Sequence, residues 1–540
     1  MMATREYFKI DEISVNNPLF SPMRATIETA FYRNNVELVT TPKEAYKLAK
    51  NSPGTIVTSW EVYNPEMLGL ERGTKVLLFN DGAVTGRYAA GRRILGTSDD
   101  NKYLEIVREA VYNTRYKKMY HGISFSGLSE EFMVKNHILI PQGHEILLYN
   151  WLLNFQYPSQ EYESMYRKSF RYNEGDIYIF VDPDWKHPDF PLGLAIFDSE
   201  HNCAAILGMR YFGELKKGTL TLGWGIANRN GFVACHGGIK ILKNEKKDFV
   251  AAFFGLSGSG KSTLTHTKHS KYDVTVLHDD AFIISTNSLS SVALEPSYFD
   301  KTADYPSNSE DNKYLLSIQN CGVTKDENGN LIPVMEDLRN GNGRAIKSRL
   351  WSANRVDKFD SPISAIFWLM KDPTLPPIVK IDSPNMASTM GALLTTKRTS
   401  AEKLDNDVDP NALVFEPYAN PFRTYPLKED YEKFKFVFEK GVQCYILNTG
   451  YFINKKVPKH ITIQLIEDVV ENNIEWVKWF GTFYFAKIDG FLPNMEDMEY
   501  IESLKKSFLK RKDFILSKKG TRDELPEEVL RAIEQIIGLL

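Results

Sequence analysis

Residues 255–262 read Gly-Leu-Ser-Gly-Ser-Gly-Lys-Ser, a complete G-x-x-x-x-G-K-[ST] phosphate-binding loop. The apolar stretch before it, Asp248–Phe254, predicts a buried strand, and Ser262–His269 after it predicts a helix. The loop needs this strand–loop–helix context, because its glycines let consecutive backbone N–H groups turn inward onto phosphate oxygens. The N-terminus of the helix adds a partial positive charge at the same point. We therefore expect a nucleotide phosphate site here; the alternative is a chance match in an ordinary glycine turn.

Each residue of this loop has an expected task. Lys261 would neutralise the outer phosphates, and the Ser262 hydroxyl would hold a divalent metal. The residues expected to bind the nucleotide are Gly255, Leu256, Ser257, Gly258, Ser259, Gly260, Lys261, Ser262 and Thr263.

Two acidic residues, Asp279 and Asp280, follow a predicted strand at 274–277. Carboxylates at the C-terminal end of a strand beside a phosphate loop usually hold or orient the metal of the nucleotide. The alternative is an Asx turn or a helix cap. Next to a phosphate loop, the metal role is the favoured interpretation.

The length of 540 residues exceeds one ordinary core, so the chain predicts at least two domains. We place an α/β domain that binds substrate at 1–240 and a nucleotide-binding domain at 241–540. Further strands are expected along both parts, at 76–79, 176–181, 194–197, 203–207 and 442–447. The polar, glycine-rich stretch 323–347 predicts a hairpin or excursion, and the basic run Lys505–Lys519 predicts a solvated helix face.

The composition sets limits on partners and location. Hydrophobic residues make up 43%, charged residues 25%, and the net charge is -3, which gives no reason to expect nucleic acid or a charged membrane surface as partner. Long apolar runs are absent from the sequence, so we expect no transmembrane helix and no signal peptide, and a cytoplasmic protein. The cysteines are far apart without a C-x-x-C pair, which favours reduced core residues over disulfides or zinc: Cys203, Cys235, Cys321 and Cys444.

Two further segments are unusual: Tyr211–Gly218, which reads Tyr-Phe-Gly-Glu-Leu-Lys-Lys-Gly, and Phe232–Gly238, which reads Phe-Val-Ala-Cys-His-Gly-Gly. From pattern alone, a lone His among small residues is more often structural than catalytic, and Lys-Lys-Gly is more often a surface turn.

Together, these segments resemble the ATP-dependent phosphoenolpyruvate carboxykinases. That family carries Y-x-G-E-x-K-K-G, a histidine nineteen residues after the second lysine, then F-F-G-L-S-G-[ST]-G-K-[ST]-T-L and a paired aspartate. Here Lys217 and His236 keep the interval, and Phe253–Leu264 matches the long motif. Collinear matches at 81–87, 294–302, 348–350 and 444–450 extend the resemblance over most of the chain.

The resemblance implies a role for each matching residue. Arg87 would bind the carboxylates of oxaloacetate, and Tyr211 would line the pocket for phosphoenolpyruvate and carbon dioxide. Lys301 and Arg349 would neutralise the transferring phosphoryl group. Lys217, His236 and Asp280 would bind Mn²⁺, while Lys261 and Ser262 would hold the phosphates and the Mg²⁺ of ATP.

The implied fold is a two-lobed α/β carboxykinase fold with the phosphate loop in the C-terminal lobe and the active site in the interlobe cleft. The implied reaction is decarboxylation and phosphorylation of oxaloacetate to phosphoenolpyruvate, with small molecules as the only partners. The chain departs from the family after Arg87 and after Asp280, and the family's adenine-binding stretch is not recognisable. The nucleotide and the acceptor therefore stay open. The alternatives are a divergent kinase that acts on another small acid or a protein hydroxyl, and a nucleotide-binding sensor without catalysis.

Overall fold

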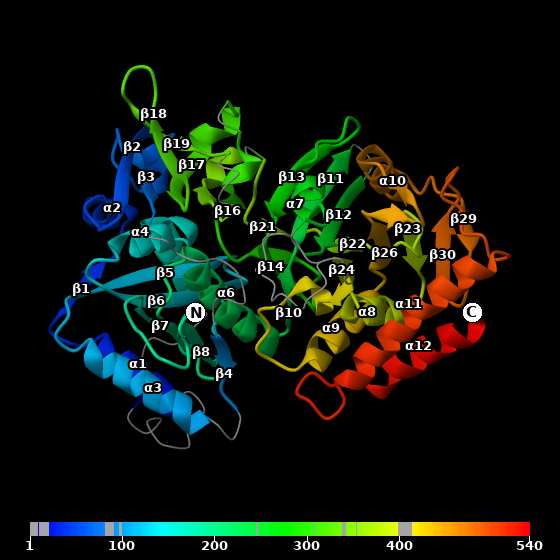
Figure 1. Ribbon diagram of the computed structural model, residues 1–540, viewed down its shortest axis with the longest axis horizontal. Helices are drawn as coiled ribbons and strands as arrows, with labels where there is room; N and C mark the ends of the chain where they lie inside the picture. The colour runs from blue at the N-terminus through cyan, green and yellow to red at the C-terminus, as the bar shows by residue number, and fades with distance from the viewer. Residues whose placement is uncertain are drawn as a thin grey trace. The chain divides into compact units, whose positions relative to one another are not determined.

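The computed structural model describes residue 9 and the ranges 21–80, 91–96, 100–244, 247–256, 258–306, 308–336, 342–352, 354–397 and 413–540. The described residues fall into two compact units. Unit 1 draws on Met1–Ile226 and Leu294–Ala353, and unit 2 on Ala227–Ala293, Asn354–Ser400 and Leu404–Leu540. Both units mix helices and strands, as a mixed α/β fold requires (Figure 1).

The main element of unit 1 is a seven-stranded mixed sheet. Its strands, in spatial order, are β1 (Val36–Val39), β5 (Met119–Ser129), β6 (Phe132–Pro141), β7 (Ile177–Asp182), β9 (Cys203–Leu207), β8 (Leu194–Asp198) and β4 (Gly91–Ile94). Strands β6, β7 and β9 run parallel, and the near-continuous apolar sequences of β7 and β9 reflect burial on both faces.

Helices cover both faces of this sheet (Figure 1). α1 (Pro22–Ala30) and α3 (Asp100–Asn113) pack on the face that carries Leu139 and Phe180. α4 (Glu145–Asn154) and α6 (Phe212–Arg229) cover the other face, where Gly122 admits Leu148 and Trp151 of α4. The other helices of unit 1 are α2 (Pro42–Ala49) and α5 (Gln160–Lys168).

A second sheet of unit 1 joins strands from distant parts of the sequence. Its order is β16 (Tyr298–Lys301), β20 (Arg344–Lys347), β17 (Leu315–Gln319), β3 (Lys75–Phe79) and β2 (Thr55–Glu61). The hairpin β18 (Gly322–Lys325) and β19 (Leu331–Val334) lies between β17 and β20 in the sequence, so the predicted hairpin is confirmed. This sheet places Lys301 at the end of β16 and Arg349 directly after β20.

Unit 2 is built on an eight-stranded sheet. Its strands, in spatial order, are β13 (Asp273–His278), β11 (Gly238–Asn244), β12 (Lys247–Phe254), β22 (Ile363–Met370), β26 (Gln443–Asn448), β23 (Ile378–Ile381), β30 (Phe483–Ala486) and β29 (Trp476–Lys478). The central strands β12, β22 and β26 run parallel. The rings of Phe253, Phe367 and Tyr445 stack across them with centroids 5.2 Å apart at each step.

Helices again cover both faces. α7 (Lys261–His266) and α10 (Lys459–Glu471) share a core with one face of the sheet. α8 (Pro384–Ala392) and α9 (Leu427–Glu439) lie on the opposite face, where the indole N–H of Trp368 donates to the Ala387 carbonyl (Figure 1). The terminal helices α11 (Met498–Ser517) and α12 (Glu527–Leu539) follow.

Smaller strand groups complete unit 2. A four-stranded sheet has the order β10 (Phe232–His236), β14 (Ala281–Ser285), β15 (Ser291–Ala293) and β21 (Lys358–Phe359). Two hairpins pair β24 (Thr395–Lys397) with β25 (Leu413–Phe415), and β27 (Tyr451–Phe452) with β28 (Lys455–Lys456).

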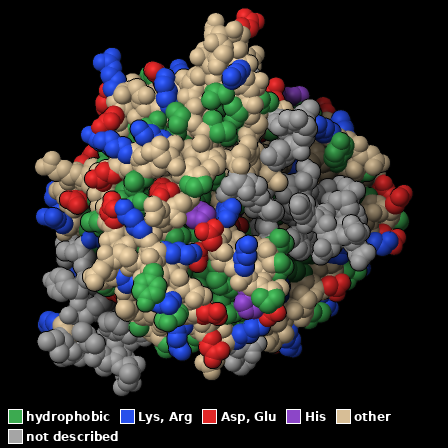
Figure 2. All heavy atoms as spheres, turned by 60° about the vertical axis from the view of Figure 1, so that its left-hand side comes forward, with side chains coloured by type: hydrophobic (Ala, Val, Ile, Leu, Met, Phe, Trp, Pro, Cys, Tyr) green, Lys and Arg blue, Asp and Glu red, His purple; other side chains and the backbone are tan. Residues whose placement is uncertain are grey.

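Most local predictions are confirmed. All strands expected from the sequence occur within one or two residues of their predicted bounds, including the strand before the phosphate loop. The helix after the loop is shorter than predicted, because it ends at His266. All four cysteines are buried and free. Within the described ranges, the chain has no helix with the length and apolarity to cross a bilayer. On the face drawn in Figure 2, Lys and Arg side chains are interspersed with Asp and Glu side chains.

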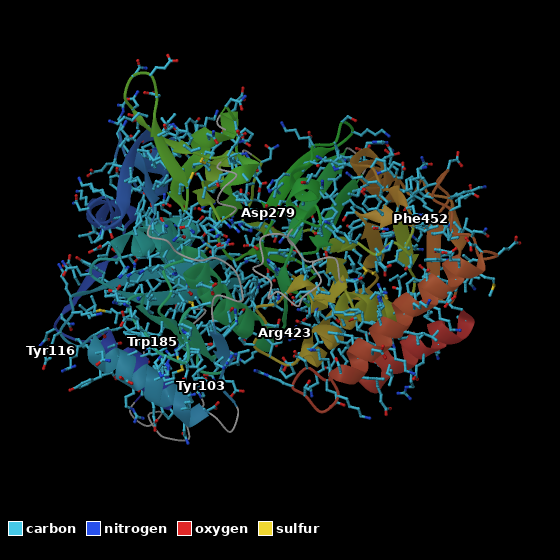
Figure 3. All side chains as sticks on the ribbon, in the orientation of Figure 1. Tyr103, Tyr116, Trp185, Asp279, Arg423 and Phe452 are labelled. Carbon is cyan, nitrogen blue, oxygen red and sulfur yellow. The ribbon has the colours of Figure 1, made fainter. Side chains whose placement is uncertain are left out.

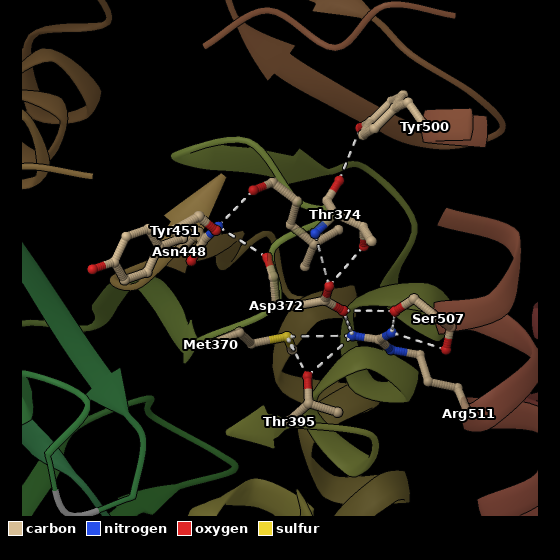
Figure 4. Close-up of polar contacts among 10 residues, drawn as sticks. Met370, Asp372, Thr374, Thr395, Asn448, Tyr451, Tyr500, Ser507 and Arg511 are labelled. Carbon is tan, nitrogen blue, oxygen red and sulfur yellow. Dashed lines mark hydrogen bonds and ion pairs between the residues drawn. The ribbon is translucent and has the colours of Figure 1, made fainter. Parts of the chain in front are cut away.

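The prediction of a solvated face for Lys505–Lys519 is wrong at one residue. Arg511 of α11 is 1% exposed, and its guanidinium lies 2.9 Å from Asp372, which follows β22 (Figure 4). Ser507 and Thr374 donate to the same carboxylate. Burial alone would raise the pKa of Asp372, but Arg511 and these donors hold that pKa below its usual value. The pattern did not reveal the pair because the partners are 139 residues apart.

Candidate active site

The phosphate loop leaves the C-terminal end of β12 and enters α7. Gly258 and Gly260 have φ angles of +80° and +92°, a backbone conformation that only glycine adopts without strain. A Cβ on Gly255 would lie 2.4 Å from Ser259 Oγ, so this position requires glycine for a different reason, close packing. The backbone N–H of Leu264 donates to the Gly260 carbonyl, which starts the helix with Lys261 in its first turn. Backbone conformation and close packing thus explain the glycines at 255, 258 and 260.

The hydroxyl of Ser259 is a buried polar group inside this loop. It makes no hydrogen bond within the part of the chain that the structure describes, although Ser259 is only 1% exposed. An unmet buried hydroxyl costs free energy, and a ligand oxygen at the loop would relieve it. By contrast, Ser262 and Thr263 lie exposed at the start of α7.

Asp279 (labelled in Figure 3) follows β13 and faces the phosphate-loop helix. Nε2 of His266, on α7, lies 3.2 Å from its carboxylate. Burial alone would raise the pKa of Asp279, but His266, His278 and Lys261 outweigh it and lower the pKa below its ordinary value. The carboxylate is therefore ionised at neutral pH.

The Asp280 carboxylate lies close to two other predicted site residues of unit 2, His236 and Lys261. Its Oδ1 lies 2.9 Å from Nε2 of His236 and 3.9 Å from Nζ of Lys261. His236 ends β10, and the neighbouring Gly237 donates its N–H to the Asp280 carbonyl. The structure thus places His236 and Lys261 beside the carboxylate of Asp280.

The His236 ring is oriented by a backbone carbonyl. Its Nδ1 lies 2.5 Å from the Ala419 oxygen, which only accepts, so Nδ1 carries the proton. Ala419 and Tyr418 both have φ above +50°, a strained conformation for residues other than glycine. Such strain persists where the surrounding structure fixes the backbone. Here the fixed Ala419 carbonyl sets the tautomer of His236, a candidate metal ligand.

This pair fits a cation. Nδ1 of His236 already donates to Ala419, so Nε2 can face the Asp280 carboxylate only as imidazolium or with another cation between them. A divalent ion can replace that proton, since imidazole and carboxylate are both good ligands of Mn²⁺. Among the described residues, no group of three or more His, Cys, Asp and Glu side chains is placed to hold a metal ion. The third predicted ligand is Lys217, which is not one of these four residue types and belongs to unit 1.

In unit 1, α6 and the residue before it supply two predicted site residues. Tyr211 precedes α6, and a Cβ on Gly213 would lie 2.3 Å from its ring, which explains the glycine of the Y-x-G pattern. Burial raises the pKa of Tyr211, and Arg344 opposes the rise. Lys217 lies on α6 with its Nζ 5.7 Å from the Trp224 ring centroid.

A buried ion pair anchors this helix. Lys216, next to Lys217, lies 2.9 Å from Glu295, and their side chains are 1% and 0% exposed. Asn154 donates to the other oxygen of Glu295. Glu295 precedes the strand that ends at Lys301. One interaction therefore links α6 to the segment that carries Lys301.

Arg349 is half-buried at the start of a short 3₁₀ turn, Arg349–Trp351. Its Nη1 donates to the Tyr162 hydroxyl at 3.0 Å and to Gln156 at 3.4 Å. These two acceptors orient the guanidinium. Two predicted site residues, Arg87 and Ser257, lie outside the described residues.

Several supporting residues were missed from the sequence. His266 is recoverable, because it is four residues after Ser262 on a helix and shares its face. Tyr162 and the Ala419 carbonyl carry no local signal, since they act on residues 187 and 183 positions away. Glu295 lies in the matched segment 294–302, but its pairing with Lys216 is not visible in the sequence.

Comparison with known proteins assigns the family. The family model described as phosphoenolpyruvate carboxykinase matches residues 78–487. The chain belongs to the phosphoenolpyruvate carboxykinase family, so the resemblance expected from the sequence is confirmed.

Individual relatives are distant. The chain is 26% identical over 298 residues to phosphoenolpyruvate carboxykinase (ATP) of Aeropyrum pernix, an alignment that covers 52% of this chain and 58% of that protein. It is 25% identical over 319 residues to the protein of the same name from Staphylococcus aureus, with 54% and 56% covered. For phosphoenolpyruvate carboxykinase (ATP) 2 of Urochloa panicoides, the identity is 27% over 197 residues, with 36% and 30% covered. The chain thus aligns with less than two thirds of each of these relatives.

Proposed function

We propose that this protein catalyses the ATP-dependent conversion of oxaloacetate to phosphoenolpyruvate. Family membership supports the enzyme class. The observation that carries the proposal is the grouping of His236, Asp280 and Lys261 next to the phosphate loop. A kinase that needs only nucleotide and Mg²⁺ has no use for an imidazole oriented in this way.

In the first step, the bond between the leaving carboxylate and the adjacent methylene carbon of oxaloacetate breaks. Carbon dioxide leaves, and the electron pair becomes an enolate. Arg87 would hold the substrate carboxylate and Tyr211 the carbon dioxide, as the resemblance implies. A divalent ion held by Lys217, His236 and Asp280 would supply a Lewis acid for the enolate oxygen.

In the second step, the enolate oxygen attacks the γ-phosphorus of ATP, and the bond to the β-phosphate oxygen breaks to release ADP. Lys261 neutralises charge on the phosphates, and Ser262 with Asp279 would serve the Mg²⁺ of the nucleotide. Arg349 and Lys301 neutralise the transferring phosphoryl group. Arg349 suits this task because Tyr162 and Gln156 orient its guanidinium, whose planar fork can bind two anionic oxygens at once.

The proposal requires the two sets of residues to act on the same substrates. We propose that they do so in an interlobe cleft between a substrate-binding N-terminal domain and a nucleotide-binding C-terminal domain, as the resemblance implies.

The test is an assay of phosphoenolpyruvate formation from oxaloacetate with ATP or GTP, in the presence of Mg²⁺ and Mn²⁺. We expect product with the wild-type chain and a loss of at least about 10²-fold in His236→Ala, because the oriented imidazole is removed. The matched control is His460→Ala, an exposed histidine on α10. Nucleotide hydrolysis without phosphoenolpyruvate would contradict the proposal and support the divergent kinase.

A further inference from the structure

A buried lysine contacts the far end of the phosphate-loop helix. Lys240 lies on β11 and is 0% exposed. Its Nζ donates to the Leu264 carbonyl at 2.6 Å and to the Thr267 carbonyl at 3.3 Å. These carbonyls lie in the last turn of α7 and directly after it, where a helix leaves its acceptors unmet and carries partial negative charge. The ammonium therefore caps the C-terminus of the helix whose first turn holds Lys261.

The third bond of Lys240 starts a chain of hydrogen bonds. Nζ lies 2.8 Å from Nε2 of His269, and Nδ1 of His269 lies 2.7 Å from Glu467 on α10. A carboxylate only accepts, so Nδ1 of His269 carries the proton and Nε2 accepts from Lys240. Three elements, β11, α7 and α10, are thus joined through one ammonium group.

The buried charge has a cost that its partners offset only in part. Burial lowers the pKa of Lys240 to about 7, and Glu467 opposes that shift. The pKa of His269 is also lowered by burial and by Lys240, which favours the neutral ring that the geometry requires. A methionine would pack in the same place without this cost, so the charge calls for a purpose beyond packing.

The dimensions of α7 suggest that purpose. The helix has six residues, too few to be stable alone, and spans about 9 Å at 1.5 Å per residue. It also packs tightly on β11, since a Cβ on Gly238 would lie 1.9 Å from Thr265 Oγ1. A shift at its C-terminus would therefore move Lys261 and Ser262 at its N-terminus.

We propose that Lys240, His269 and Glu467 form a positioning triad that clamps α7 and so sets the affinity of the phosphate loop for the nucleotide triphosphate. The inference rests on the proposed function, because it takes the loop to bind nucleotide. The triad does not touch the reacting atoms. It acts through the helix, by holding the loop in its binding geometry before the ligand arrives.

The test is titration calorimetry of Mg·ATP on the full chain, with steady-state kinetics beside it. In Lys240→Met, we expect the Kd and the nucleotide KM to rise about tenfold, while kcat and the oxaloacetate KM change less than about threefold. His269→Ala should weaken binding similarly, and His269→Gln should restore it, since glutamine can accept from Lys240 and donate to Glu467. The matched control is Lys243→Met, an exposed lysine on the same strand.

The outcomes separate the two proposals. Wild-type chain that binds no Mg·ATP contradicts the proposed function itself. Wild-type binding with Lys240→Met and His269→Ala within twofold of it overturns the triad alone. If Lys240→Met does not fold, His269→Ala and its rescue by His269→Gln decide. Failure of both His269 variants to fold, or an equal loss in both, also overturns it, because the residues would then serve stability only.

Discussion

The two units hold their candidate catalytic groups in different ways. In unit 2, the groups are each other's partners: His236, Asp280 and Lys261 meet at a carboxylate that is 19% exposed. In unit 1, the candidate groups are supported by residues with no chemical task of their own: Glu295 pairs with Lys216, the neighbour of Lys217, and Tyr162 accepts a hydrogen bond from Arg349. Removing one of these partners should therefore affect activity in unit 2 and stability in unit 1.

The largest expected effect is on activity in unit 2. Asp280→Asn keeps the shape but removes the charge that His236 and Lys261 share, so we expect phosphoenolpyruvate formation to fall about 10³-fold, roughly 4 kcal/mol. The free energy of unfolding should change by less than about 1 kcal/mol, because the carboxylate is partly hydrated. Kinetics and urea unfolding of the same preparation measure both.

Asp248→Asn is the control for this variant, since Asp248 pairs with Lys243 at an exposed site. A loss of stability in Asp280→Asn as large as its loss of activity would remove the distinction between the units.

The next effect is on stability in unit 1. Glu295→Gln leaves the Lys216 ammonium buried without its counter-charge, which should lower the free energy of unfolding by about 3 kcal/mol. Urea unfolding followed by tryptophan fluorescence measures the change. Adding Lys216→Met to the variant should recover part of the loss, because no buried charge then remains unpaired.

The exposed pair of Lys43 and Glu71 is the matched control, and Glu71→Gln should leave the free energy of unfolding nearly unchanged. If Glu295→Gln and Glu71→Gln lower the free energy of unfolding equally, burial of the Lys216–Glu295 pair does not add to the stability of unit 1.

The same contrast explains what the sequence could predict. The phosphate loop, its strand and the paired aspartates are local patterns, and their elements occur where the spacing placed them. The supports are not local: Tyr162 is 187 residues from Arg349, and Glu467 is 198 residues from His269. Charge pattern alone made Arg511 a surface residue, although Asp372 pairs with it in the core. Residue types and spacings thus predict candidate reacting groups, whereas the residues that support them depend on the tertiary fold.

The smallest predicted effect concerns acid, which should act on the two units with opposite sign. In unit 1, burial and the neighbouring His137 lower the pKa of His121 to about 3, below the unfolded value of 6.5. Its stabilising contribution is thus present above pH 6.5 and is lost as the pH falls toward 3. In unit 2, burial raises the pKa of Asp430 to about 6, although Arg423 opposes it, and the unfolded value is 3.8. Its contribution therefore increases as the pH falls from 6 toward 3.8.

Urea unfolding at pH 7.5 and pH 5.0 measures these opposite contributions. Between pH 7.5 and pH 5.0, the free energy of unfolding of the wild type should fall by about 2 kcal/mol more than that of His121→Gln. The free energy of unfolding of Asp430→Asn should fall by about 1 kcal/mol more than that of the wild type. His460→Gln, an exposed histidine, should follow the wild type. Equal pH dependence in His121→Gln and the wild type would mean that the His121 ring takes a proton in the folded state as readily as in the unfolded chain, although it shares a hydrogen bond with His137. In that case, the pairing of buried histidines would not contribute to the difference in pH dependence between the two units.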